Sequence, residues 1–229
     1  MMRHMRMLRV FLFGVVVLGF GAPAWAAKFA EARIYIEFNQ TGNDLGYHVS
    51  LDGEDWTSLM IVNPEGKTIF EVAGSAAYQD LGMTELFFEG AEPSLDDFPL
   101  ADLLALFPEG RYTFIGVTVG GTRVVSRATL THAVPDGPPV AAEVNDDTVT
   151  IRWEPVTGPP EDFPDRGISI VGYQVIVDSF QVTLPASSTE VTVPREFIES
   201  LGPGEHPFEV LAIDASGNQT ITEGSFETR

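Results

Sequence analysis

Two stretches of alternating apolar and polar residues place the strongest constraint on what this chain can fold into. Residues 34–41 read IYIEFNQT and residues 149–156 read VTIRWEPV, and each alternating run ends on an aromatic ring, Phe38 or Trp153. A period of two turns successive side chains to opposite faces of a β-strand. Each stretch therefore predicts a strand that buries one face, and the pair favours a β-sheet protein over a helical one.

Two further correspondences follow in the same order along the chain. Residues 46–52 (GYHVSLD) match residues 172–178 (GYQVIVD), and both run from a glycine and a tyrosine to a closing aspartate. Residues 106–114 (LFPEGRYTF) match residues 201–208 (LGPGEHPF), which are one position shorter. Three matches in one order indicate an internal repeat, and we predict an all-β chain of two consecutive antiparallel β-sandwiches.

A proline-rich segment marks the boundary between the two halves. Residues 131–139 read THAVPDGPP, and prolines at these positions prevent a central strand from continuing. We therefore predict a first domain over residues 27–133, a linker over 134–139 and a second domain over 140–229. Paired prolines stiffen a connection, so the relative orientation of the two domains should be restricted.

The second half carries the landmarks of a known family. Trp153 ends its second predicted strand, Tyr173 lies in the third, a Leu-x-Pro-Gly turn covers residues 201–204, and residues 214–218 (DASGN) suit the last loop. On these residues the second half resembles a fibronectin type III domain. The resemblance implies two facing antiparallel sheets and recognition through loops or sheet edges.

One landmark of that family is altered. A corner tyrosine, whose hydroxyl bonds back to the main chain, usually follows the Leu-x-Pro-Gly turn. In the second half His206 or Pro207 falls at this position, whereas Tyr112 in the first half keeps the full spacing after Pro108. The first half should therefore keep the corner.

The first half is an immunoglobulin-like or fibronectin-like sandwich with an insertion and resembles no named family. Leu100, Leu103, Leu104 and Phe107 recur at helical spacing, and Pro99 suits the first turn, so a short helix is predicted there. Residues 83–88 predict a strand, and residues 120–121 (GG) a hairpin turn.

The first 26 residues have the pattern of a secretory signal peptide. Arginines precede an uncharged apolar run at residues 10–20, and residues 24–26 (AWA) fit a cleavage site. The run is too short to cross a bilayer, which needs about 20 residues. We predict cleavage near Ala26, a periplasmic or secreted bacterial protein, and no membrane insertion once the leader is removed.

Composition narrows the possible partners. The chain has no cysteine, which excludes disulfides, thiolate metal sites and a cysteine nucleophile. Its formal net charge of −20 repels nucleic acid and anionic lipid, so neither is predicted as a partner. The charge suits either an exported protein kept soluble by its surface or an acidic recognition surface.

The motifs of catalysis are missing from the sequence. The chain has no G-x-S-x-G elbow, no H-E-x-x-H pair and no glycine-rich loop between a strand and a helix. Two sandwiches filled by their own side chains leave little room for a deep catalytic cleft. We predict that the chain is not an enzyme, although its many acidic residues leave chance carboxylate pairs open.

Metal ligands are scattered along the sequence. His48 alternates with apolar neighbours and is predicted to be an exposed strand residue, His132 lies in the linker, and His206 lies in a turn. No cofactor is predicted. If calcium binds, Asp52, Glu54 and Asp55 are the first candidates, and the alternative is that this acidic turn is simply solvated.

These observations favour a non-catalytic exported binding or spacer protein of the bacterial envelope or extracellular space, with a protein or glycan partner. Trp56 and Phe163 lie in acidic, loop-like surroundings and are the candidate binding aromatics. The alternative is that each ring packs over the end of its own core. Two other functions stay open: a carbohydrate-active enzyme or its accessory module, and a structural subunit of a surface assembly.

Overall fold

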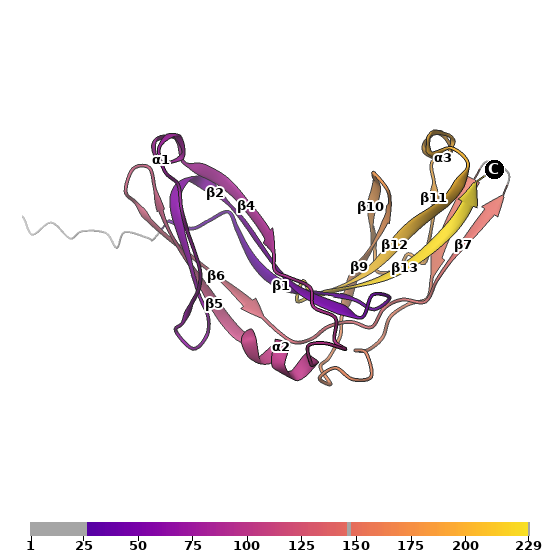
Figure 1. Ribbon diagram of the computed structural model, residues 1–229, viewed down its shortest axis with the longest axis horizontal. Helices are drawn as coiled ribbons and strands as arrows, with labels where there is room; N and C mark the ends of the chain where they lie inside the picture. Colours follow the sequence, from indigo (N-terminus) through magenta and orange to yellow (C-terminus); the bar gives the residue numbers. More distant parts are fainter. Residues whose placement is uncertain (1–26, 146–147, 229) are drawn as a thin grey trace, which may run out of the picture.

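The computed structural model describes residues 27–145 and 148–228, so the predicted signal peptide at 1–26 lies outside the described residues. The described chain is mostly strand, which confirms the all-β class, and Figure 1 shows it as two arms that meet at an angle. The strands of the first arm are β1 (Glu31–Asn39), β2 (Asp44–Val62), β3 (Thr68–Ala73), β4 (Met83–Glu89), β5 (Gly110–Thr118) and β6 (Arg123–Leu130). The second arm holds β7 (Val140–Asn145), β8 (Thr148–Trp153), β9 (Ile170–Val177), β10 (Phe180–Pro185), β11 (Glu190–Val193), β12 (Gly204–Asp214) and β13 (Gln219–Thr228). The described residues also form three short helices: α1 (Ala77–Leu81), α2 (Leu100–Leu106) and α3 (Arg195–Leu201).

Strand β2 builds both layers of the first arm. Its first half pairs with β1 and β4, and its second half pairs with β3 and β5. The register shifts between Asp52 and Ser58, where Asp55 has a φ of 37°. Because the strand bends there, its two halves lie in different layers and enclose one apolar core between them.

The second arm is a sandwich of two sheets. Strands β11, β8 and β7 form one sheet, and β10, β9, β12 and β13 lie in the other. Alternate residues of both sheets meet in a second core, where Trp153 packs against Tyr173 with ring centroids 5.5 Å apart. The alternation predicted around Trp153 therefore does mark a buried sheet face.

The predicted helix, strand and hairpin of the first arm are all present. Helix α2 buries Leu103 and Leu104 and begins after Pro99, β4 covers the predicted strand, and residues 119–122 turn the chain from β5 into β6. Helix α3 follows Pro194 in the second arm at the equivalent place and was not predicted. Both prolines have a φ of −55°, a value that suits the start of a helix.

Both arms have a corner bond after their helix. The Tyr112 hydroxyl donates to the Pro108 carbonyl at 3.1 Å, which confirms the corner predicted for the first half. In the second half the ring of His206 replaces the phenol, and its Nε2 lies 3.1 Å from the Gly202 carbonyl oxygen. The bond thus spans four residues in both arms, although the side chains differ.

The strands that carry the matched sequence stretches, β1 and β2 in the first arm and β8 and β9 in the second, are paired differently in the two arms. Strand β1 pairs directly with β2, whereas β8 and β9 belong to opposite sheets. The connections explain the difference, because residues 40–43 form a tight hairpin turn, whereas residues 154–169 are long enough to cross from one sheet to the other.

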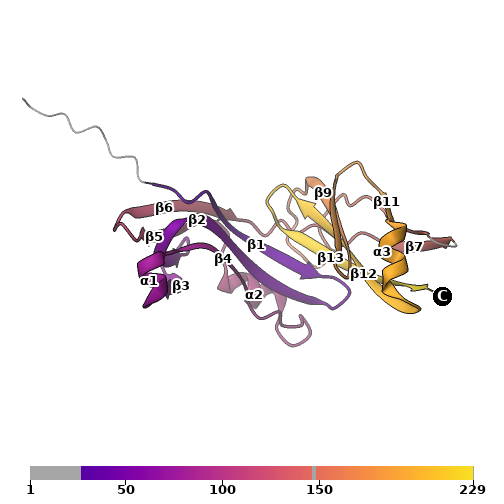
Figure 2. The ribbon, with the colours of Figure 1, turned by 90° about the horizontal axis from the view of Figure 1, so that it is seen from above.

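One sheet runs through both arms. Strands β1 and β13 pair in parallel, with Glu37 opposite Gln219 and Phe38 opposite Thr220, so ten strands from both halves share a sheet. Figure 2 shows these two strands side by side where the arms meet. The restricted orientation expected from the linker prolines is thus accompanied by direct pairing between the halves.

The Asn218 side chain connects three segments at this junction. Its Oδ1 accepts the backbone N–H of Ile36 at 2.8 Å, and its Nδ2 donates to the carbonyl oxygens of Thr131 at 2.8 Å and Ala133 at 3.0 Å. Asn218 is almost completely buried. One amide group therefore satisfies β1 and the proline-rich segment 131–139 together, while its own backbone leads into β13.

The connection between β8 and β9 also reaches the first arm. Phe163 belongs to the first core, with its ring centroid 4.7 Å from that of Phe38. Arg166 forms an ion pair with Glu109 at 2.9 Å. Residues of the second half thus complete the interior and the surface of the first.

Replacing Asn218 with alanine should destabilise the protein strongly. The change leaves the Ile36 N–H and two carbonyl groups without these partners, and each buried unsatisfied group costs about 1–3 kcal/mol. We expect the free energy of unfolding in urea to fall by roughly 3 kcal/mol. Asn145→Ala is the control, since that amide bonds to Glu143 on the surface. Equal stability of the two variants would contradict this role for Asn218.

The Glu109–Arg166 pair should make stability depend on pH. The hydrogen bond from Arg166, aided by the His132 N–H, lowers the pKa of Glu109 from 4.5 to about 2. Folding therefore favours the charged carboxylate, and its contribution is present above pH 4.5 and lost as the pH falls toward about 2. Scanning calorimetry of Glu109→Gln should show a melting-temperature deficit at pH 7 that shrinks on acidification.

Arg166→Gln provides the matched background for this measurement. Without the guanidinium the same Glu109→Gln substitution should produce a smaller pH-dependent deficit, because the main cause of the lowered pKa of Glu109 is gone. An equal deficit in both backgrounds would show that Arg166 has no part in it.

Candidate functional site

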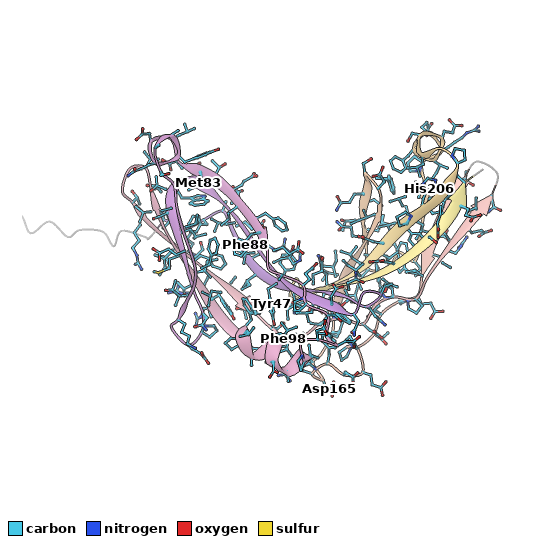
Figure 3. The ribbon with its side chains drawn as sticks, in the orientation of Figure 1. Tyr47, Met83, Phe88, Phe98, Asp165 and His206 are labelled. Carbon is cyan, nitrogen blue, oxygen red and sulfur yellow. The ribbon has the colours of Figure 1, made fainter. Side chains whose placement is uncertain are left out.

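An apolar pocket opens on the side of the first arm. It has a volume of about 540 Å³ and lies between β3, β4 and α2. Figure 3 shows Phe88, Tyr47 and Phe98 along this arm, from β4 to the segment before α2. The main lining side chains are Tyr47, Phe70, Phe88, Phe98, Leu103 and Leu106.

Aromatic contacts hold the walls of the pocket. Phe88 of β4 stacks on Phe70 of β3 with centroids 4.3 Å apart, and Tyr47 of β2 stacks on Phe107 at 3.9 Å. The Tyr47 hydroxyl donates to the Leu103 carbonyl at 3.1 Å, which ties α2 to the sheet. Burial raises the pKa of Tyr47, so this phenol stays protonated and continues to donate.

The mouth of the pocket is apolar as well. Leu106 on α2 is 58% exposed, although it belongs to the lining. Glu92 is the charged residue of the lining, and the Tyr47 hydroxyl is already used by Leu103. The pocket therefore suits an apolar guest and offers few polar groups to a sugar.

A second depression of about 880 Å³ is lined by residues of β7, β8, α3 and β13. It is lined by Asn145 and Thr148, which flank residues 146–147 outside the described part of the chain. No site is assigned to it.

Near the junction of the arms, Glu37, His48 and Glu92 form a cluster. Each side chain offers one atom that could bind a metal ion, and these three atoms all lie within 4.8 Å of one another. Among the described residues, this is the one group of three or more His, Cys, Asp or Glu side chains that lie so close together. His48 Nε2 lies 3.5 Å from Glu37 Oε1 and 4.0 Å from Glu92 Oε1. The arrangement comes from the β1–β2 register, which sets Glu37 opposite Gly46 and Tyr35 opposite His48 on one face.

The surroundings of the cluster are strongly acidic. Burial, a hydrogen bond with Glu89 and the charges of Glu89, Asp44 and Glu37 raise the pKa of Glu92 to about 7. Burial and the charge of Glu223 raise the pKa of Asp44 in the same way. Carboxylates from β1, β2, β4 and β13 thus meet at the base of the angle between the arms.

The prediction that His48 is exposed was wrong. The residue is only 4% exposed, because the Tyr35 ring stacks on its imidazole at 5.0 Å and the Phe87 ring lies at 5.7 Å. The alternation correctly assigned His48 to the sheet face opposite the core, but aromatic neighbours cover that face. Pairing the strands across the hairpin turn at 40–43 would have shown Tyr35 beside His48.

The two candidate binding aromatics are both buried. Trp56 is completely buried in its own core at the bend of β2, which agrees with the packing alternative. Phe163 is buried too, but it packs in the core of the first arm instead of its own. Neither ring is available as an exposed contact, since both pack in the core of the first arm.

The calcium candidates do not come together. Asp52, Glu54 and Asp55 are exposed at the bend of β2, and they form no group of close ligand atoms among the described residues. The two other histidines within the described ranges bond to the main chain: His132 Nε2 lies 2.9 Å from the Phe107 carbonyl oxygen, and His206 makes the corner bond.

Comparisons with known proteins give no family. No protein-family model matches the chain, and no curated protein is detectably similar to it. Among solved structures, a tetra-tandem repeat from the extending region of a large adhesion protein has 11% identity and a TM-score of 0.29, with 87% of this chain and 50% of that chain covered. The BSP domain of a biofilm-associated protein has 14% identity and a TM-score of 0.26, with 87% and 29% covered.

A third solved structure is an enzyme. The spore cortex lytic enzyme SleM of Clostridium perfringens has 19% identity and a TM-score of 0.31, with 42% of this chain and 28% of that chain covered. The chain thus spans half or less of the length of these three proteins. Scores this low carry no argument about function, which depends on the geometry of the pocket and the cluster.

Proposed function

We propose that this chain is a non-catalytic exported binding module that takes a small apolar ligand, an aromatic ring or a short acyl chain, into the pocket of its first arm. The pocket between β3, β4 and α2 is the observation that carries the proposal. Its volume of about 540 Å³ falls within the range of ordinary small-molecule sites.

The pocket is an opening that the protein's own side chains leave. Both cores are otherwise closed by large buried rings such as Trp56, Tyr112 and Tyr173. An exposed apolar lining costs free energy in water, roughly 25 cal/mol per Å². A guest that covers Leu106 and the stacked Phe70 and Phe88 rings removes that cost, so binding is driven by apolar burial.

The second arm supports a presenting role. Its seven strands divide three and four between facing sheets, with Trp153 and Tyr173 in the core, which supports the proposed likeness of this half to a fibronectin type III domain. The pairing of β1 with β13 joins this arm directly to the sheet of the first. Such an arm can hold the pocket at a fixed distance and angle from whatever the protein is joined to.

Export fits the same role. The leader pattern at 1–26 and the net charge of −20 suit a soluble protein outside the cytoplasm. Among the described residues no helix has the length and apolar character needed to cross a bilayer. On the leader pattern and the charge, we propose that the protein works in the periplasm or the extracellular space.

Nile red, a neutral apolar dye, should bind the purified processed protein saturably and with increased fluorescence. Leu106→Asp adds a charge at the mouth and removes apolar lining, so it should weaken binding at least tenfold, about 1.4 kcal/mol. The exposure of Leu106 makes the fold tolerant of this change. Fluorescence titration gives both dissociation constants.

Leu81→Asp is the matched control, because Leu81 is a leucine on a short helix of the same arm, is 75% exposed, and does not line the pocket. This variant should bind the dye like the unmodified protein. The proposal fails if the dye does not bind saturably or if both leucine variants lose affinity equally. Light scattering without the dye tests one further outcome. If the unmodified protein forms a dimer and Leu106→Asp abolishes it, the pocket is instead a contact between two copies of the chain.

A further inference from the structure

We propose that Glu37, His48 and Glu92 form a binding site for a divalent transition-metal cation of the zinc type at the junction of the two arms. The three side chains come from β1, from β2 and from the segment after β4, and their ligand-type atoms lie within 4.8 Å of one another. The inference does not depend on the apolar pocket.

The decisive observation is the state of the His48 ring. His48 is only 4% exposed, yet neither Nδ1 nor Nε2 has a hydrogen-bond partner among the described residues. A buried polar group without a partner costs about 1–3 kcal/mol, so a structure that keeps one normally uses it. Nε2 lies beside the carboxylates of Glu37 and Glu92, and a bound cation would satisfy it.

The distances suit a shared cation better than direct hydrogen bonds. His48 Nε2 lies 3.5 Å from Glu37 Oε1 and 4.0 Å from Glu92 Oε1, beyond the usual hydrogen-bond range of about 2.7–3.2 Å. Ligand atoms around a tetrahedral zinc ion, with bonds of about 2.0–2.1 Å, are roughly 3.4 Å apart. Small side-chain shifts would therefore bring all three atoms into coordination.

The imidazole decides the class of metal. Calcium and magnesium prefer six or more oxygen ligands, whereas zinc readily combines histidine nitrogen with carboxylate oxygen. Three protein ligands leave a fourth position for water or another ligand. The surrounding carboxylates of Glu89 and Asp44 add negative charge that favours a cation further.

Neighbouring side chains hold the ligands in place. Gln219 of β13 donates from its Nε2 to Glu37 Oε2, which directs Glu37 Oε1 toward His48. The Tyr35 ring stacks on the imidazole with centroids 5.0 Å apart. Such supporting contacts commonly affect metal affinity 10–100-fold. Because Gln219 belongs to the second arm, a bound ion would also fasten the junction.

Gly46 makes room for Glu92 in the cluster. A Cβ added at Gly46 would lie 2.7 Å from Glu92 Cγ and 2.8 Å from its Oε1, so Gly46→Ala must displace this side chain. The ligands themselves stay chemically intact in that variant. Gly90→Ala is its matched control, since a Cβ there meets only the Tyr47 carbonyl oxygen at 3.8 Å.

The test is a calorimetric titration of chelator-stripped protein with zinc chloride, at physiological salt and with excess magnesium and calcium to occupy non-specific acidic sites. We expect a single equivalent to bind and the melting temperature to rise. Glu92→Gln and Gly46→Ala should each weaken binding at least tenfold, His48→Gln should abolish it, and Gly90→Ala should change nothing. Glu54→Gln controls for the loss of one exposed carboxylate.

Cobalt supplies a readout that does not depend on stability. If His48 and two carboxylates coordinate the ion, bound Co²⁺ should show visible absorption bands that disappear in His48→Gln and in Gly46→Ala. The proposal is overturned if the unmodified protein binds no zinc, if His48→Gln binds it equally well, or if the Gly46 and Gly90 variants behave alike. Calcium binding of equal tightness that survives His48→Gln would also overturn it, because the site would then be made of oxygens alone.

Discussion

The amide of Asn218 is the constraint on which the arrangement of the two arms depends. It satisfies the Ile36 N–H of β1 and the carbonyl oxygens of Thr131 and Ala133 in the proline-rich segment 131–139, all within a buried junction. With these groups paired, β1 and β13 lie in parallel and one sheet continues through both halves. The next residue, Gln219, then reaches Glu37, so the junction also orients a carboxylate of the acidic cluster. The contacts around Asn218 thus help to set both the angle between the two arms and the position of the Glu37 carboxylate.

The structural features that depend on residues close together in the sequence could be predicted from it. The alternation around Phe38 and Trp153 marks faces that are buried in two separate cores, the spacing of Leu100, Leu103 and Leu104 marks α2, and Tyr112 keeps its corner. Contacts between the halves were not predicted, because pairing between residues 37 and 219 has no period along the chain. Phe163 shows the same limit: its sequence surroundings indicate a loop, and only the fold reveals which core it enters.

The candidate sites were missed for two different physical reasons. A pocket is a volume that side chains fail to fill, and the lengths and bends of β2, β3 and β4 that leave this volume are not encoded in any short motif. The cluster around His48 was accessible in principle. The turn at 40–43 sets Asn39 opposite Asp44, and counting back two residues at a time reaches Glu37 opposite Gly46 and Tyr35 opposite His48. Glu92, however, lies in the irregular segment after β4, which has no strand register to place it. Its side chain fits beside His48 because Gly46 has no Cβ in that space.

Glu92 belongs to both proposed sites, and this has an energetic consequence. The residue lines the apolar pocket, while its Oε1 lies 4.0 Å from His48 Nε2. In its ionised form, a carboxylate at the edge of an apolar pocket opposes the removal of water by a guest, because its charge loses hydration. A cation held by Glu37, His48 and Glu92 neutralises that charge and lowers this cost. Since coupling between two binding events is reciprocal, the same guest would tighten the cation, and the two sites would act as one unit at the base of the angle between the arms.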